Sequence, residues 1–311
     1  MSSSWSLRRR RSLADEARET AATATPPLVA VLTIARDEGE MLARWVDHYG
    51  RAAGHENLIV FDDGSTDGST DDLGCTVQRL PGFRKGSFES GRMRLASGVA
   101  QGLLGIYDVV IFTDVDEFLV PDPASYADLS DYLARRPDQV IAPLALNIVH
   151  HTALEGPMVS GKPIVGQRAF AQFAPLMCKP SVKRVPAAWT NASHGIEAPY
   201  VPDAGLFMLH MKFADVDLLR RQADRRNQLA KSVGRGKGSS WGRSGDDLAG
   251  LLTRATASVG ADVEEFDPTT VLPARLVRKE NGVYRADGPG HIDNLRNHPL
   301  LRIPERLHGI V

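Results

Sequence analysis

The sequence predicts an α/β protein with an open sheet flanked by helices, and three apolar segments that run into polar loops support this. They cover residues 28–34, 57–61 and 109–112. Short apolar runs bounded by turn residues are typical of buried strands. A helical pattern separates the first strand from the second. This order favours an open α/β sheet, whose ligands bind at the carboxyl ends of the strands.

The first unit joins a predicted strand, residues 28–34, to a predicted helix through the polar residues 35–38. In the helix, apolar side chains recur at the three- and four-residue spacing of one buried face. They are Met41, Leu42, Trp45, Val46 and Tyr49. Asp37, with Glu40 three residues later, fits a capping box of the acidic kind. We therefore expect the helix to begin close to the end of the first strand.

The second unit is the predicted strand 57–61, which ends in an acidic, glycine-rich loop over residues 62–69. Asp, Ser and Gly favour turns because their side chains bond the local backbone or permit unusual backbone angles. Taken alone, this is an ordinary acidic loop. Its resemblance to a calcium-binding loop is weak, because the closing Glu of such loops is missing.

The third unit is the most informative, because an apolar strand runs directly into Asp114 and Asp116. Side chains alternate between the two faces of a strand, so these carboxylates converge only if the strand ends there. Mg²⁺ and Mn²⁺ prefer carboxylate oxygens, and Mg²⁺ takes one or two of them beside substrate phosphates. A divalent cation is therefore the expected ligand. A solvated acidic turn is the alternative.

Three motifs in this order, TIARDEGEMLARWVDHY, FDDGSTDGS and FTDVDEFLVP, resemble a family 2-type glycosyltransferase of the bacterial branch with a D-x-D-E-F signature. The resemblance spans residues 28–121 and fades after about Phe213. It implies a GT-A type fold, which is a Rossmann-like open mixed sheet. It also implies a Mn²⁺ or Mg²⁺ cofactor and a nucleotide-sugar donor, with UDP favoured by family habit. The acceptor would be a saccharide or another hydroxyl compound.

The resemblance assigns residues to the donor and to the metal. It places Thr33, Arg36 and Glu38 near the base and ribose, and Asp63 as an acceptor of a hydrogen bond from them. Family members often carry Asn at the position of Asp37.

Arg92 belongs to a basic stretch, with Arg84, Lys85 and Arg94, that the family sets near the donor. Asp114 and Asp116 would face the metal and the diphosphate, with Asp116 as the more direct ligand. Glu117 and Phe118 are expected to shape the loop.

The second half offers candidates for the remaining roles. The resemblance suggests that His210 is a metal ligand contributed by the later part of the chain. The alternative is that His210 is a hydrogen-bonded residue of the core. His194 is the other candidate for the ligand. An inverting reaction needs a carboxylate to take the acceptor's proton. Glu197 is the first choice for this base, in a loop that suits an acceptor site. Asp203 and Glu155 follow it. The pair His150-His151 is expected to be structural or to face the acceptor.

Residues 218–243 contain eight basic side chains and one acid, Asp224. This segment is either a solvated helix with a connector or a lid whose cations cover the diphosphate after the donor binds.

Composition fits an enzyme of the cytoplasm. The net charge of −1 gives no drive towards nucleic acid. The two cysteines, Cys75 and Cys178, form no disulfide framework, and no apolar run has the length of a transmembrane helix. We expect a disordered tail over residues 1–27, with weak contact to anionic lipid through its arginines. A transferase domain would cover residues 28–215, and a partly helical extension residues 216–311.

Two other classes stay open. Phosphatases of the haloacid dehalogenase type also end a strand in D-x-D, although their motif continues with Thr or Val where this chain has Phe118. The second class is a non-catalytic relative of the glycosyltransferases that only binds nucleotide or sugar. Intact metal carboxylates at Asp114 and Asp116 argue against it.

Overall fold

A ten-stranded mixed sheet forms the centre of the structure, a computed structural model that describes residues 26–83, 87–190, 192–233 and 242–311. Its main path has the order β14-β7-β6-β8-β4-β1-β2-β3, and β11 joins β6 to β5. The strands are β1 (Val29–Ala35), β2 (Leu58–Asp62), β3 (Thr76–Arg79), β4 (Val109–Phe112), β5 (Glu117–Pro121), β6 (Val140–Val149), β7 (Phe170–Phe173), β8 (Val182–Lys183), β11 (Pro202–Phe213) and β14 (Leu301–Arg302). The predicted open mixed sheet flanked by helices is therefore confirmed.

The three predicted strands lie next to one another in this sheet. β1 pairs in parallel with both β2 and β4, so the carboxyl ends of all three meet at one edge. β11 runs parallel to β6 and antiparallel to β5. As a result, the end of β11 lies beside the start of β5 and close to the loop that follows β4.

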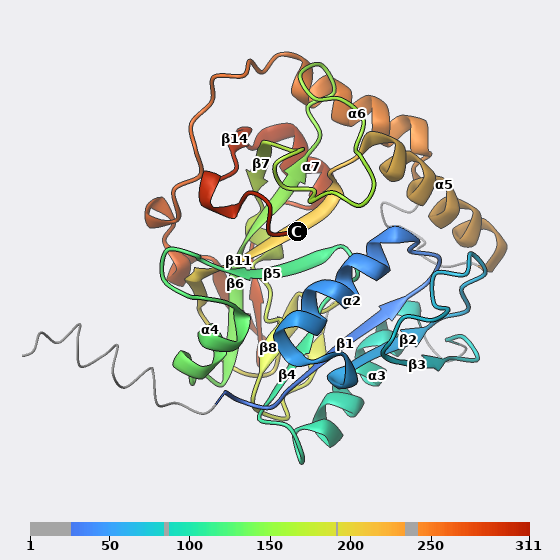
Figure 1. The fold of residues 1–311 in the computed structure, drawn as a ribbon, viewed down its shortest axis with the longest axis vertical. Coiled ribbons are helices and arrows are strands. Elements are labelled where there is room, and N and C mark those ends of the chain that lie inside the picture. Colours follow the sequence, from blue (N-terminus) through green and yellow to red (C-terminus); the bar gives the residue numbers. More distant parts are fainter. Residues whose placement is uncertain (1–25, 84–86, 191, 234–241) are drawn as a thin grey trace, which may run out of the picture.

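Helices cover both faces of the sheet (Figure 1). They are α2 (Glu40–Ala53), α3 (Phe88–Leu103), α4 (Leu129–Arg135), α5 (Val216–Val233), α6 (Gly245–Ala257) and α7 (His291–Asn297). Short 3₁₀ helices lie at His55–Asn57, Pro175–Met177, Pro268–Thr270, Pro273–Arg275 and Glu305–Leu307. Within the described residues, no helix combines the length and the apolar character needed to cross a membrane.

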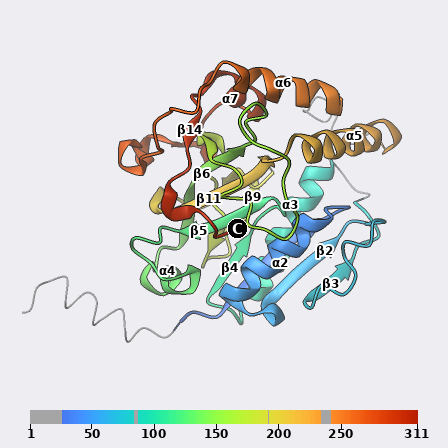
Figure 2. The same ribbon diagram turned by 45° about the horizontal axis from the view of Figure 1, so that its top comes forward.

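Alternate residues of β1 pack on opposite faces, as the pleat of a strand requires. Val29 and Val31 join the apolar cluster of α2, whereas Ala30 and Leu32 join the cluster of α3. Figures 1 and 2 show these two helices on opposite sides of the sheet. All five apolar residues predicted for the buried face of α2 are buried, so that prediction is confirmed.

The predicted capping box at the start of α2 is wrong. Gly39 occupies the N-cap position and no side chain caps the helix. Asp37 instead has a φ of 52°, a left-handed conformation that Asp adopts more readily than most residues. Its carboxylate accepts a hydrogen bond of 2.7 Å from the backbone N–H of Thr66. Asp37 therefore joins the loops after β1 and β2.

Two aromatic side chains of α2 hold the connection between β4 and β5 in place. Trp45 donates its Nε1–H to Thr113 Oγ1 at 2.9 Å. The Tyr49 hydroxyl donates to the carbonyl of Glu117 and accepts from the N–H of Leu119, both at 3.0 Å. The carboxylates between Thr113 and Glu117 are thus positioned from the core side of the sheet.

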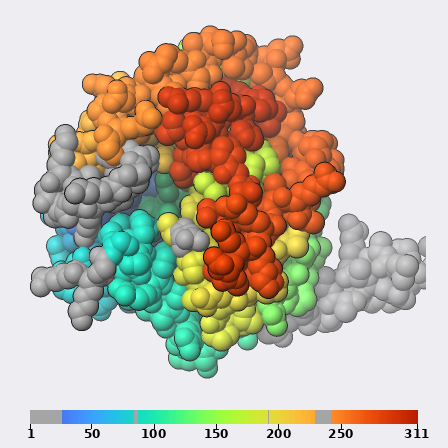
Figure 3. Space-filling view, turned by 180° about the vertical axis from the view of Figure 1, so that it is seen from behind, coloured from blue at the N-terminus to red at the C-terminus, as the bar shows by residue number. Residues whose placement is uncertain are grey.

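Residues after 215 take part in two sheets. β14 pairs with β7 in the main sheet. A second sheet has the order β12-β13-β10-β9 and is formed by β9 (Trp189–Thr190), β10 (Gly195–Ile196), β12 (Val277–Glu280) and β13 (Val283–Ala286). Figure 3 shows these red and orange residues beside the yellow segment that holds β9 and β10. The boundary at residue 215 stays a prediction, as does the N-terminal tail, of which residues 1–25 lie outside the described part.

Replacing Tyr49 with Phe tests the anchoring of the β4–β5 connection. The change keeps the ring but leaves a buried N–H and a buried carbonyl without this partner, so we expect a loss of about 1–3 kcal/mol in the free energy of unfolding. Urea denaturation followed by circular dichroism measures it. Tyr107→Phe, which removes a half-buried hydroxyl bonded to Asn57, is the control and should cost about 1 kcal/mol or less. Equal losses in the two variants would contradict the anchoring role.

Candidate active site

A cavity of about 270 Å³ lies at the carboxyl ends of β1 and β11 and beside the β4–β5 connection. Helices α3, α5 and α7 contribute further residues to its walls. Eight side chains that the sequence nominated line it: Arg36, Glu38, Asp63, Arg92, Asp114, Asp116, His194 and His210. Thr33 does not, because it is buried inside β1. The expected edge of the sheet therefore holds the site.

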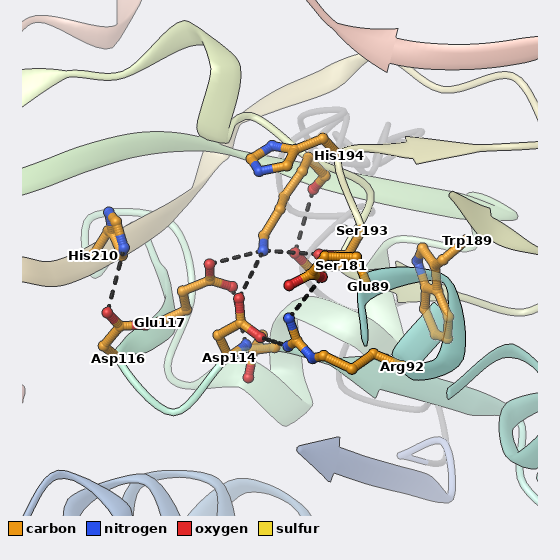
Figure 4. A network of polar contacts seen from close by, with 12 residues as sticks. Glu89, Arg92, Asp114, Asp116, Glu117, Ser181, Trp189, Ser193, His194 and His210 are labelled. Atoms are coloured by element: carbon orange, nitrogen blue, oxygen red, sulfur yellow. Dashed lines mark hydrogen bonds and ion pairs between the residues drawn. The ribbon is translucent and has the colours of Figure 1, made fainter. Parts of the chain in front are cut away.

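Asp116, Glu117 and His210 could hold a metal ion, because one ligand atom from each lies within 4.8 Å of the other two. His210 Nε2 lies 3.5 Å from Asp116 Oδ2 (Figure 4). The other ring nitrogen, Nδ1, lies 2.7 Å from Asn147 Oδ1. When a metal binds, a proton on Nδ1 would leave the lone pair of Nε2 free to face the ion. Two carboxylates and an imidazole supported in this way fit Mn²⁺ or Mg²⁺.

The charge of Asp116 is well stabilised. Burial alone would disfavour its ionised form, but His210, Arg226 and Lys212 outweigh burial and hold the pKa of Asp116 below its ordinary value. A carboxylate that stays ionised under acidic conditions suits a metal ligand.

Asp114 has a different environment from Asp116. It contacts Arg92 (Figure 4), and its Oδ2 lies 3.8 Å from Lys179 Nζ. Its backbone N–H donates to Glu117 Oε2 at 3.2 Å. The metal group contains Asp116 and His210, as predicted, and Glu117 as its third member. The sequence analysis had assigned Glu117 to shaping the loop. Metal ligation by Asp114 stays a prediction.

Lys179 is the most consequential residue that the sequence analysis did not find. Its Nζ lies 2.7 Å from Glu117 Oε1 and donates to Ser193 Oγ at 2.9 Å. Lys179 and Glu117 both have side chains only 1% exposed. Burial disfavours the charged form of Lys179, yet Glu117 and Asp114 outweigh burial and raise the pKa of Lys179 above its ordinary value. No local signal predicts this contact, because residue 179 lies far along the chain in a loop.

The donor residues predicted from the resemblance meet at the ends of β1 and β2. Arg36 donates to the backbone carbonyl of Asp63 at 3.0 Å, and the same nitrogen lies 3.8 Å from the Asp63 carboxylate. Asp63 is buried. Glu38 accepts a hydrogen bond of 3.1 Å from Gln222 of α5. Burial raises the pKa of Glu38 to about 7, with Arg226 opposing the shift.

Three predicted candidates for the catalytic base lie outside the cavity. Glu197 is exposed and does not line it. Asp203, at the start of β11, accepts from the Tyr132 hydroxyl at 2.6 Å. Glu155 accepts from the backbone N–H groups of residues 151 and 169. The inverting course and the assignment of Glu197 stay predictions from the sequence, without support from this geometry.

The histidines occupy distinct positions. His194 lines the cavity, bonds the carbonyl of Leu176 through Nδ1 at 2.9 Å, and has its pKa lowered to about 3 by burial. His291 of α7 packs 5.3 Å from the His210 ring and was not predicted. His150 and His151 bond backbone carbonyls away from the cavity, which fits the structural alternative.

Helix α5 brings the first part of the basic segment to the cavity. Gln222, Arg225 and Arg226 line it, and Arg225 donates to the carbonyl of Asp37 at 2.7 Å. Lys212, two residues after His210 on β11, also lines it, and burial together with Arg226 lowers its pKa to about 8. Lys212 stands only two residues after the predicted His210 in the same apolar stretch, so that stretch could have indicated Lys212.

Some predicted basic residues lie outside the described part of the chain. They are Arg84, Lys85, Arg235, Lys237 and the side chain of Lys231. The lid stays a prediction.

Comparisons with known proteins give similarities among solved structures only, because no family model and no curated protein matches. A mycobacterial protein is 22% identical over 48% of this chain and 50% of its own, with a TM-score of 0.28. Glucosyl-3-phosphoglycerate synthase from Mycobacterium tuberculosis, in complex with Mn²⁺ and UDP-glucose, is 20% identical over 44% of this chain and 49% of its own, with a TM-score of 0.27. The chain thus spans about half the length of these two proteins.

A mannosyltransferase from Pyrobaculum calidifontis, in complex with GDP-Man and Mn²⁺, is 15% identical over 76% of this chain and 77% of its own. Its TM-score is 0.33. Because these scores are low, we base the assignment of function on the residues of the cavity.

Replacing Lys179 with Met removes a positive charge that the buried Glu117 and the half-buried Asp114 share. We expect the free energy of unfolding to fall by about 3–5 kcal/mol, because Glu117 is left charged and uncompensated in the interior. Urea denaturation measures the loss. Adding Glu117→Gln to the variant should restore part of it. The exposed control Lys162→Met should change stability by less than about 0.5 kcal/mol, and a similarly small effect of Lys179→Met would refute the role given to this network.

The raised pKa of Glu38 predicts a pH dependence. Between the ordinary value of 4.5 and the folded value of about 7, the native state binds more protons than the unfolded state. Stability therefore falls as the pH rises through this window. Glu38→Gln removes that loss, so the variant should gain stability relative to the wild type between about pH 5 and about pH 8. Chemical denaturation at both pH values checks this, with exposed Glu56→Gln as control, and a pH-independent difference would argue against it.

Proposed function

We propose that the protein is a metal-dependent glycosyltransferase that moves a sugar from a nucleotide-sugar donor, with a UDP-sugar as first choice, to a saccharide or another hydroxyl acceptor. One observation carries the proposal. The group Asp116, Glu117 and His210 opens into the same cavity as Arg36 and Asp63. A nucleotide sugar needs both, because a cation suits its diphosphate and polar side chains suit its nucleoside.

The residues have separate tasks in this proposal. Asp116 and His210 would hold the metal, with Glu117 as a third ligand. When bound, Mn²⁺ or Mg²⁺ neutralises charge that develops on diphosphate oxygens. Asp63 and Arg36 would bind the base and ribose. The hydrogen bond to the Asp63 carbonyl holds the Arg36 side chain in place before the donor arrives, which lowers the entropy lost on binding.

In this proposal, the ion pairs around Asp114 hold the side chains of the metal group in a fixed geometry. Arg92 and Lys179 approach Asp114 from different elements, and Lys179 also holds Glu117. Catalytic groups must be held to within a fraction of an ångström, which rigid supporting contacts achieve. His194 and Ala192 line the cavity next to Lys179, and this wall is the proposed approach for the acceptor.

A screen of nucleoside diphosphates and nucleotide sugars tests the proposal. Thermal unfolding is followed with each ligand, with and without Mn²⁺. A ligand at a hundred times its Kd stabilises the folded state by about 2.7 kcal/mol, so a matching donor should raise the Tm, and more so with Mn²⁺. The best donor is then assayed for nucleotide release. Hydrolysis of simple phosphate esters, with no nucleotide raising the Tm, would instead favour a phosphatase.

Asp116→Asn examines the metal group directly. We expect nucleotide release to be abolished and Mn²⁺ affinity to fall, because loss of a metal carboxylate costs several kcal/mol of stabilisation of the transition state. Titration calorimetry with Mn²⁺ and the turnover assay measure the two effects. Asp71→Asn, at an exposed position two residues after the acidic loop, should leave both unchanged. Wild-type turnover by Asp116→Asn in saturating Mn²⁺ would rule out this assignment.

A further inference from the structure

Two cations of the cavity, Lys212 and Arg226, differ from the others in their contacts with the described part of the chain. Each of the other arginines and lysines in its lining bonds or pairs with a carboxylate or a carbonyl, as Arg36, Arg92 and Lys179 do. Lys212 and Arg226 form no hydrogen bond or ion pair with another described residue, although both line the cavity.

The two side chains come from different elements and line the same cavity as the metal group. Lys212 follows His210 by two positions on β11, and both side chains line the cavity. Arg226 belongs to α5, which covers the cavity from outside the sheet. Both act electrostatically on Asp116, and Arg226 also acts on Lys212. Two positive charges therefore line the cavity that also holds Asp116 and His210.

Placing two like charges together in a partly buried wall costs free energy unless an anion joins them. Carboxylates of the cavity act on these cations, but they have other partners. Asp116 lies 3.5 Å from His210 and belongs to the metal group, and Glu38, which acts on Arg226, accepts a hydrogen bond from Gln222. A ligand with several anionic oxygens would meet both cations at once. Lys suits a phosphate as a point charge, and Arg suits it through paired donors.

We propose that Lys212 and Arg226 form an anion site that binds the diphosphate of the donor. The site rests on the proposed function, since it specifies where the donor's phosphates lie in that cavity. It is distinct from the predicted lid, because Lys212 belongs to the central sheet and Arg226 to the described part of α5. The anion would lie between these cations and the group of Asp116 and His210.

Inorganic pyrophosphate is the probe, because it has the diphosphate without a nucleoside or a sugar. Its Kd is measured by calorimetry on the full chain, with and without Mn²⁺. Lys212→Met and Arg226→Gln should each weaken binding about ten-fold or more, as expected for lost hydrogen bonds to a charged group. Lys212→Arg should retain most of the affinity. Circular dichroism confirms that each variant is folded.

Charge-matched controls are available on the same elements or on the surface. Arg220→Gln removes an exposed arginine of α5 that pairs with Asp217 and Asp246, and Lys279→Met removes an exposed lysine of β12. Both should change the Kd less than about two-fold, because screened surface charges contribute little. Equal losses in controls and test variants would reduce the effect to net charge and overturn the proposal.

A competition experiment separates the donor's diphosphate from an anionic group on the acceptor. The nucleoside diphosphate that gives the largest thermal shift should exclude pyrophosphate. Simultaneous binding of both would place the anion site on the acceptor side and overturn the proposal, as would wild-type pyrophosphate affinity in folded Lys212→Met and Arg226→Gln. If no nucleotide sugar is turned over but both variants still lose pyrophosphate affinity, the proposed function fails and the anion site stands.

Discussion

The ion pair between Lys179 and Glu117 is the contact on which the geometry of the cavity depends. Both side chains are almost fully buried, and the lysine also reaches Asp114 and Ser193. It therefore ties the β4–β5 connection to the loop between β9 and β10. Burying such charges costs several kcal/mol for each ion, and only close, well-oriented partners offset that cost. The network holds one arrangement of carboxylates at the carboxyl ends of the strands.

Around this network, the cavity divides into two chemical halves. On one side, Arg36 and Asp63 join the loops after β1 and β2, and Asp37 reinforces them through Thr66. On the other side, β11 brings both His210 and Lys212 to the cavity. Helix α5 joins the halves, because Arg225 bonds the β1 loop while Arg226 acts electrostatically on Asp116. The later part of the chain thus supplies cations to a site whose carboxylates come from the earlier part.

The sequence predicted what depends on local patterns. The strands β1, β2 and β4 and the buried face of α2 follow from apolar periodicity, which directly reflects burial. The predicted strand that ends in acidic residues pointed to Asp114 and Asp116, and both line the cavity. Lys179 was missed because its partners lie in another part of the chain, and no short pattern encodes a long-range ion pair. The predicted capping box is absent because the Asp37 carboxylate accepts a hydrogen bond from Thr66 in the neighbouring loop. Glu197 was chosen for its type and its polar surroundings, and neither reveals that it is exposed to solvent directly after β10.

The second sheet has a consequence for how the protein is made. β10 pairs with β13, and the main sheet gains β14 as its edge beside β7. The ribosome synthesises the chain from the N-terminus to the C-terminus, so β7 and β10 emerge well before β14 and β13 have been made. Until then they expose unpaired backbone groups of the kind that promotes aggregation. Pairing of distant segments is also slow. We therefore expect folding to finish late in translation, and a truncated product ending near residue 215 to leave both edges open.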